Sequence, residues 1–240
     1  MDILLLLLLL AMFRHLLSLS ALVQAQAREA IEVLVDMVDA RDASTRQHSE
    51  RVATYSCSIA SAMGLEQGQI ACITVSARLH DLGKVGIGDE WLYKTAPLTA
   101  EEWAQLQRHP ALGADIVARF PALGVDPTLV RHHHEWWDGQ GYPDRLNGEK
   151  IPLGARIICV ADAFDAMTSD RPYRKALSYA QARRQLREHA GTQFDPTVVD
   201  LALPVLPGAA EENASSPLQG NDGDSSSNQQ IFNSPLTFNQ

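Results

Sequence analysis

The sequence is poor in cysteine, with only three in 240 residues. Cys57, Cys72 and Cys159 are far apart, and no two of them form a CxxC pair. This spacing excludes a zinc knuckle and a disulfide framework as organising features of the fold. The simplest interpretation is that all three are buried free thiols in a reducing compartment.

Basic residues are also scarce, because 20 lysines and arginines face 29 aspartates and glutamates and leave a formal net charge of −9. Nonspecific binding to DNA or RNA depends on a basic surface. The charge balance therefore argues against a nucleic-acid polymer as partner. A small phosphate ligand remains compatible with it where basic groups gather locally.

Sustained alternation of apolar and polar residues, the pattern of a half-buried strand, is missing from every window. Apolar residues recur instead at helical spacing, as in Ile31, Leu34, Val35 and Val38. Residues that start or end helices punctuate the chain: Gly64, Thr99 with Glu102, Pro110, Asp126 with Pro127, Ser178 with Gln181, Gly191, and Asp195 with Pro196. The sequence predicts an all-α domain.

The N-terminal segment, residues 1–27, opens with eleven consecutive apolar residues from Ile3 to Phe13. Three interpretations stay open: a helix that packs on the domain or a partner, a membrane anchor through residues 3–23, and a cleaved signal ending near Ala27. A membrane span needs about 20 apolar residues. Arg14 near its centre would cost ~2.5–3.5 kcal/mol on insertion scales.

The C-terminal segment, residues 208–240, is rich in Ser, Asn, Gly and Gln. Such a composition buries too little apolar area to offset the entropy of ordering, so we expect a disordered tail. The remaining residues, 28–207, form the predicted domain.

Several ionisable side chains share helical faces with apolar residues in this domain. His48 lies four residues before Val52, and Asp162 lies four after Ile158. Buried charges are normally paired or bound to metal. The same spacing argument predicts inward-pointing side chains at further positions: His80, His109, His133 and His134. Asp81 follows His80 at an offset from which a carboxylate can bridge two cations ~3.5–4 Å apart.

The order of these residues, with the string HHEWWDGQGYP at residues 133–143, resembles the HD-GYP family of metal-dependent phosphohydrolases. The resemblance runs from about Arg28 to Val199. It implies an HD-domain helical bundle around a dinuclear metal site, in which His48, His80, Asp81 and Asp162 hold one ion. Asp81 as bridge, with His109, His133 and His134, would hold the second.

The resemblance also implies the identity of the metals. Imidazole and carboxylate ligands suit iron, manganese or zinc better than magnesium or calcium, and iron or manganese is usual in the family. Some members hold a third metal with a glutamate four residues before the first histidine. Ser44 occupies that position here, so two divalent ions are expected.

Further residues are assigned to catalysis and substrate binding through the same resemblance. Lys84 would bind a phosphate oxygen and stabilise charge in the transition state, acting with Asp81 as a catalytic residue. The predicted substrate-binding residues are Lys84, Gly141, Tyr142, Pro143, Arg171 and Arg174. Arginine suits bidentate contact with phosphate.

The function implied is hydrolysis of cyclic di-GMP to pGpG, to GMP or to both, in bacterial second-messenger signalling. Two alternatives stay open: an HD-superfamily phosphohydrolase or dimetal oxygenase acting on another substrate, and a non-catalytic cyclic-dinucleotide receptor. The helix predicted at residues 28–40 suggests a homodimer. Because cyclic di-GMP is made and read in the cytoplasm, a cytoplasmic domain is expected, with attachment to the inner membrane left open.

Overall fold

A computed structural model describes residues 3–41, 47–92, 94, 96–170 and 175–209. Helices make up its elements in the order α1 (Ile3–Arg41), α2 (His48–Ala62), α3 (Gln67–Arg78), η1 (Leu82–Gly86), α4 (Asp89–Leu92), α5 (Ala100–Leu106), α6 (His109–Val117), η2 (Pro121–Leu123), α7 (Pro127–His132), η3 (Gly148–Lys150), α8 (Leu153–Thr168), α9 (Tyr179–Glu188) and α10 (Pro196–Ala202). These residues contain no β-strand, which confirms the predicted all-α class.

The predicted start signals are confirmed as helix caps. Thr99 with Glu102 opens α5 as a capping box, and Ser178 with Gln181 opens α9 in the same way. Asp126 and the equivalent aspartate before α10 each accept a hydrogen bond of 2.8 Å from the N–H two residues on. The local sequence therefore sets where these helices begin.

The core is built around α8, in which nearly every residue is buried. Ile157, Ile158 and Phe164 are fully buried there, and α2, α3, α7, α9 and α10 pack around this helix. Each such side chain contributes about 1.5–3 kcal/mol by leaving water. The same helix carries two aspartates, Asp162 and Asp165, into the core.

The cysteine prediction is confirmed in one respect and wrong in another. All three cysteines are free thiols, and Cys159 is buried in α8. Cys57 on α2 and Cys72 on α3 are only half-buried, because they pack against the edge of the core.

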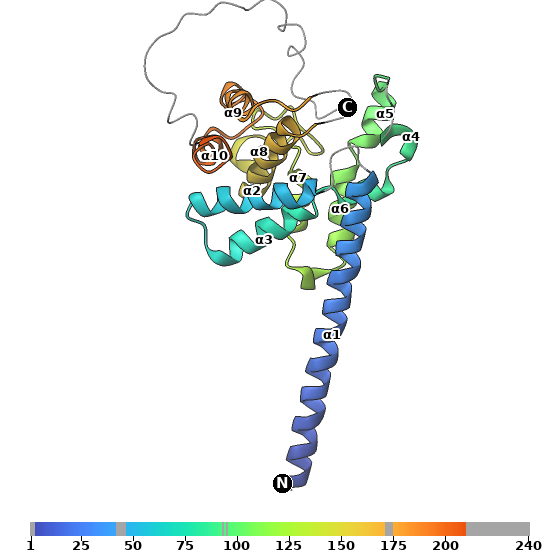
Figure 1. The fold of residues 1–240 in the computed structure, drawn as a ribbon. Coiled ribbons are helices and arrows are strands. Elements are labelled where there is room, and N and C mark those ends of the chain that lie inside the picture. The colour runs from blue at the N-terminus through green and yellow to red at the C-terminus, as the bar shows by residue number, and fades with distance from the viewer. Residues whose placement is uncertain (1–2, 42–46, 93, 95, 171–174, 210–240) are drawn as a thin grey trace, which may run out of the picture.

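The first helix, α1, projects far beyond the rest of the domain (Figure 1). Its stretch Leu5–Gln26, 22 residues with mean hydropathy 2.1, is long and apolar enough to cross a membrane, and none of it is buried. In this structure the stretch does not pack on its own domain, and packing on a partner, a membrane anchor and a cleaved signal all stay predictions. Near the other end of α1, Val35 and Val38 are buried, whereas Leu34 of the predicted stripe is 37% exposed.

Three predictions fall on residues that the structure does not describe. They are the phosphate-binding roles of Arg171 and Arg174, the substitution at Ser44, and the disordered tail from residue 210 onward.

A candidate dinuclear metal centre

Seven buried side chains gather in two groups at the centre of the domain. In each group, one potential ligand atom per residue lies within 4.8 Å of the others. The first group consists of His48, His80 and Asp162, and the second group consists of Asp81, His109, His133 and His134. The structure therefore brings together all seven residues that the sequence singled out.

Helices α2 and α8 supply His48 and Asp162, and His109 begins α6. The histidines expected on the inner faces of α3 and α7 lie elsewhere. Helix α3 ends at Arg78 and α7 ends at His132, so His80 and His133 lie in the turns just beyond. A turn aims consecutive side chains in different directions, and for this reason His80 and Asp81 belong to different groups.

Hydrogen bonds to the backbone orient three of the histidines. The Nδ1 atoms of His80, His109 and His133 lie 2.6, 2.8 and 2.7 Å from the carbonyl oxygen three residues earlier in the chain. A carbonyl oxygen only accepts, so Nδ1 carries the proton and Nε2 presents a lone pair. This is the arrangement in which a histidine binds a metal ion.

Several atoms inside the centre lack a hydrogen-bond partner among the described residues. They are the Nε2 atoms of His80, His109 and His133 and the Oδ1 atom of Asp81, all buried. Leaving such an atom unsatisfied costs about 1–3 kcal/mol. Divalent cations would satisfy imidazole nitrogens and carboxylate oxygens together, so the donor set fits two such ions.

Asp81 lies between the two groups. Its Oδ1 atom is 3.3 Å from His109 Nε2. Its Oδ2 atom is 3.4 Å from His80 Nε2 and 3.9 Å from His48 Nε2. One oxygen thus faces each group, which is the geometry a bridging carboxylate requires.

The electrostatics of the centre favour neutral imidazoles at His133 and His134 and attract positive charge at His80. Burial lowers the pKa of His133 and His134 well below the usual value, and neighbouring histidines lower it further. Burial also acts to lower the pKa of His80, but Asp81 and Asp162 outweigh it and raise that pKa to about 9. The carboxylates therefore draw a proton to a position that a cation would take.

Behind His48 lies a charged pair formed by Arg51 and Asp165. His48 Nδ1 is 2.7 Å from Asp165 Oδ2, and Arg51 donates from Nε and Nη2 to the same carboxylate at 2.5 and 2.9 Å. Burial acts to raise the pKa of Asp165, but these bonds keep it below the ordinary value. Arg51 follows His48 by three residues on α2, and this spacing could have identified it.

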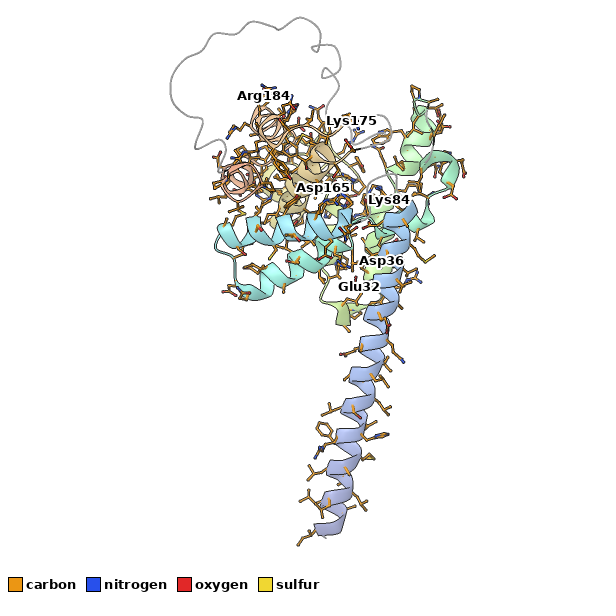
Figure 2. The ribbon with its side chains drawn as sticks, in the orientation of Figure 1. Glu32, Asp36, Lys84, Asp165, Lys175 and Arg184 are labelled. Atoms are coloured by element: carbon orange, nitrogen blue, oxygen red, sulfur yellow. The ribbon has the colours of Figure 1, made fainter. Side chains whose placement is uncertain are left out.

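Lys84 lies at the edge of the centre, in η1, where Figure 2 labels it beside the end of α1. Its Nζ atom is 2.7 Å from Asp81 Oδ2. Burial acts to raise the pKa of Asp81, but Lys84 and, after it, His80 outweigh burial and hold that pKa well below its usual range. An ammonium group here can reach a phosphate oxygen next to the ligand groups.

The segment after His134 forms a tight turn that places Tyr142. The Tyr142 ring lies 4.8 Å from the His134 ring and 6.5 Å from the His109 ring. At Gly141 a Cβ atom would collide with the N–H of Trp136 and lie 2.5 Å from the His134 carbonyl, so only glycine fits. Pro143, next in the chain, is half-buried.

Glu135 and Trp103 complete this side of the centre. The buried Glu135 carboxylate accepts backbone N–H bonds from Asp144 and Leu146 at 2.7 and 3.1 Å, so it holds the turn in place. Trp103 on α5 meets Tyr142 edge to face at 5.9 Å and was missed by sequence reasoning. An isolated tryptophan on a short helix carried no signal.

Comparisons with known proteins agree with this geometry. The HD domain family matches residues 32–198, and the chain belongs to that family. Bd1817, an HD-GYP protein from Bdellovibrio bacteriovorus, superposes with a TM-score of 0.52 at 21% identity, covering 68% of this chain and 51% of that one. Membership of the HD-GYP branch, expected from the motifs, is confirmed.

Two curated relatives are similar over most of the domain. A cyclic di-GMP phosphodiesterase response regulator, RpfG of Xanthomonas campestris, is 38% identical over 185 residues, 75% of this chain and 48% of its own length. A 3′3′-cGAMP-specific phosphodiesterase of Vibrio cholerae is also 38% identical, over 74% of this chain and 34% of its own length. The chain therefore spans half or less of these relatives.

The HD domain of the L. monocytogenes phosphodiesterase PgpH, in complex with cyclic di-AMP, shares the fold. Its TM-score is 0.52 at 16% identity, over 78% of this chain and 99% of that one. At this identity the superposition shows the fold alone.

Proposed function

We propose that this protein is a metal-dependent phosphodiesterase that hydrolyses cyclic di-GMP. The observation that supports it most is the convergence of seven buried imidazole and carboxylate groups beside a lysine. Relatives named as cyclic di-GMP phosphodiesterases share 38% identity over this domain.

The proposal assigns the ligands as follows. His48, His80 and Asp162 would hold one ion, and His109, His133 and His134 would hold the other, with Asp81 available to both. The mixed nitrogen and oxygen donor set is the reason to favour iron or manganese over magnesium or calcium. When bound, the two ions supply a water molecule activated at neutral pH and neutralise charge on the phosphate.

The chain's own residues then bind and orient the substrate. Lys84 Nζ holds a phosphate oxygen and stabilises the extra negative charge of the transition state. Tyr142, placed by Gly141 and Pro143, lines the dinucleotide pocket. Arg171 and Arg174 bind phosphate, a role that rests on the family resemblance alone because both lie outside the described residues. Water oxygen bonds to phosphorus, the bond from phosphorus to the 3′ oxygen breaks, and a proton passes to that oxygen. The product is pGpG, with GMP after a second round.

Metal analysis combined with a substrate panel tests the proposal. The full chain, purified anaerobically in detergent, is stripped of metal and reloaded with Mn²⁺ or Fe²⁺, and its products from cyclic di-GMP, 3′3′-cGAMP and cyclic di-AMP are separated by chromatography. We expect turnover of cyclic di-GMP only after reloading, with two ions per chain. Undiminished turnover by the metal-free protein contradicts the mechanism.

The panel also separates the alternatives. If the protein hydrolysed another nucleotide faster than cyclic di-GMP, it would be an HD-superfamily phosphohydrolase with that nucleotide as its substrate. The name of the Vibrio relative makes 3′3′-cGAMP the first such candidate. Binding of cyclic di-GMP by the metal-loaded chain without any turnover would favour a receptor. The intact set of seven ligands supports the enzyme.

We also propose that residues 3–23 attach the chain to the inner membrane, with the domain in the cytoplasm. At about 1.5 Å per residue, the 22 residues Leu5–Gln26 would reach about 33 Å, against a hydrocarbon core of about 30 Å. Flotation of the full chain with phospholipid vesicles, compared with a chain lacking residues 2–26, tests this. Cross-linking of the same samples tests the proposed homodimer through residues 28–40.

A further inference from the structure

One end of α1 is bonded to the N-terminus of α2. Asp39 on α1 is 8% exposed, and its carboxylate accepts hydrogen bonds from the Ser49 hydroxyl at 2.6 Å and the Ser49 N–H at 3.3 Å. Gln47, the residue before α2, supplies no side-chain cap of its own. The N-terminus of α2 is therefore capped by a carboxylate from another helix, where negative charge is favourable.

A second link joins α1 to the end of α3. Arg78, the last residue of α3, donates from Nε to Glu32 of α1 at 2.6 Å. The same guanidinium pairs with Glu50 of α2. Figure 2 shows Glu32 on the part of α1 that runs beside the domain. Arg78 thus connects three helices at one point.

Both links end beside residues of the first ligand group. Ser49 follows His48 directly, and Arg78 precedes His80 by two residues. Cavities of about 600 and 490 Å³ are lined in part by Arg78, the larger one also by Asp39 and Ser49. The seam between α1 and the domain is thus only partly packed: Val35 joins an apolar cluster with Leu79 and Leu82, and the polar links act beside it.

We propose that α1 positions the first ligand group, with Asp39 and Glu32 as positioning residues for His48 and His80. This inference rests on the proposed metal-dependent function and adds a control point to it. A metal ligand must be held within about 0.5 Å of its working position. Displacing α1 would therefore weaken the binding of an ion to the first group and leave the binding of an ion to the second group unchanged.

Ion binding to the full chain tests this, with matched variants on the same helix. Asp39→Ala is compared with Asp36→Ala, and Glu32→Ala with Glu29→Ala. The side chains of Asp36 and Glu29 are exposed and make no hydrogen bond or ion pair with any described residue. Mn²⁺ is titrated into each metal-stripped protein, and free Mn²⁺ is followed by electron paramagnetic resonance. Unfolding temperatures are measured alongside.

We expect Asp39→Ala and Glu32→Ala to weaken binding of one of the two Mn²⁺ ions by about tenfold. This is the lower end of the effect of removing a group bonded to a ligand, because Asp39 and Glu32 act through Ser49 and Arg78. The affinity for the other ion should equal that of the unaltered chain, and both control variants should bind both ions as the unaltered chain does. Ser49→Ala should reproduce part of the Asp39→Ala effect, and the double variant should add little to it, because both variants remove the bond from the Ser49 hydroxyl to Asp39.

The outcomes separate this inference from the proposed function. If the unaltered chain holds two ions and hydrolyses its substrate, but neither variant changes Mn²⁺ affinity, the positioning role is overturned alone. Equal weakening of both ions, or equal effects of the control variants, overturns it too. If the unaltered chain binds no Mn²⁺, the proposed function falls with it. Glu32, being partly exposed, provides the test if Asp39→Ala fails to fold.

Discussion

His48 and His133 are both buried imidazoles of the metal centre, yet their Nδ1 atoms have different kinds of partner. His48 bonds to Asp165, a carboxylate 117 positions away in the chain. His133 bonds to the carbonyl oxygen of Val130, three positions away. His48 thus depends on a side chain brought close by packing, whereas His133 and His109 of the second group, like His80 of the first, depend on local backbone turns.

The difference extends to the surroundings of each group. The carboxylate of Asp165 is itself held by Arg51, and α1 reaches the same helix end through Asp39. Around the second group, close contacts between backbone segments hold the side chains in position. At Gly83 a Cβ atom would collide with the carbonyl of His109 and lie 2.5 Å from the N–H of Gly113. The part of the first group around His48 should therefore respond to charge changes, and the second group to added volume.

The largest effect should come from the residue shared by both groups. Asp81→Ala removes the carboxylate that faces His80 on one side and His109 on the other. We expect turnover to fall by at least about 10³-fold, since the loss exceeds that of a single transition-state donor. The helices should persist by circular dichroism, and metal analysis should show both ions weakened. If the variant kept its full affinity for either ion, Asp81 would not be shared between the two groups.

A smaller effect, confined to the second group, is expected from Gly141→Ala. The new methyl group meets only backbone atoms, at Trp136, His134 and Glu135, and these cannot give way as a side chain can. We expect a loss of about 1–3 kcal/mol in the free energy of unfolding. Turnover should fall about 100-fold if His134 and Tyr142 move by about 1 Å.

Gly68→Ala is the matched control for this change. Gly68 lies in α3 with nothing within 4 Å of the new methyl group. Alanine is favoured over glycine in a helix by about 1 kcal/mol, so stability should rise slightly with unchanged turnover. Urea unfolding and initial rates measure both variants. Equal behaviour of the two would show that added volume near the second group is harmless.

For the first group, charge removal is the sharper probe. Asp165→Asn keeps the size of the side chain but removes the negative charge that His48 and Arg51 face. We expect metal affinity of the first group to fall about 10–100-fold. Asp115→Asn, on the exposed surface of α6, should leave it unchanged. Mn²⁺ titration of both proteins measures these affinities. If Asp165→Asn weakened binding to the second group instead of the first, the contrast between the two groups would be wrong.

The contrast between local and distant contacts also explains which parts of the centre could be predicted from the sequence. Helical spacing and motif order singled out all seven residues of the two groups, because each lies next to apolar residues or in a recognisable string. Spacing placed His80 and His133 on helices, although both lie in turns, because the pattern of apolar residues does not show where hydrogen bonding ends. Local signals such as Thr99 with Glu102 fixed helix starts correctly.

Contacts between distant segments were not predictable. Neither the bond from Arg51 to Asp165 nor the cap that Asp39 gives to α2 has a local pattern, because each joins residues on different helices. Trp103 meets Tyr142 only after the chain folds back over the site. The apolar stretch of α1 was recognised at once, but only the structure shows that the domain leaves it exposed.

The smallest expected effect concerns the surface beyond the second group. Arg131 holds the Asp144 carboxylate through two bonds of 2.7 and 2.8 Å and, with His132, lowers its pKa to about 2. A folded-state pKa below the unfolded value of 3.8 means that the pair stabilises the protein above about pH 3.8. That stabilisation is lost as the pH falls toward 2.

Asp144→Asn should therefore lower the free energy of unfolding at pH 7, and the difference from the unaltered chain should shrink between pH 3.8 and 2. Asp144 is 36% exposed, so solvent screening limits the effect to about 1 kcal/mol or less. Urea unfolding at several pH values measures it, and 1 M salt at pH 7 should reduce it. Since Glu135 holds the same turn through backbone bonds, turnover should barely change. A large loss of turnover would mean that the second group, like the first, depends on a distant charged pair.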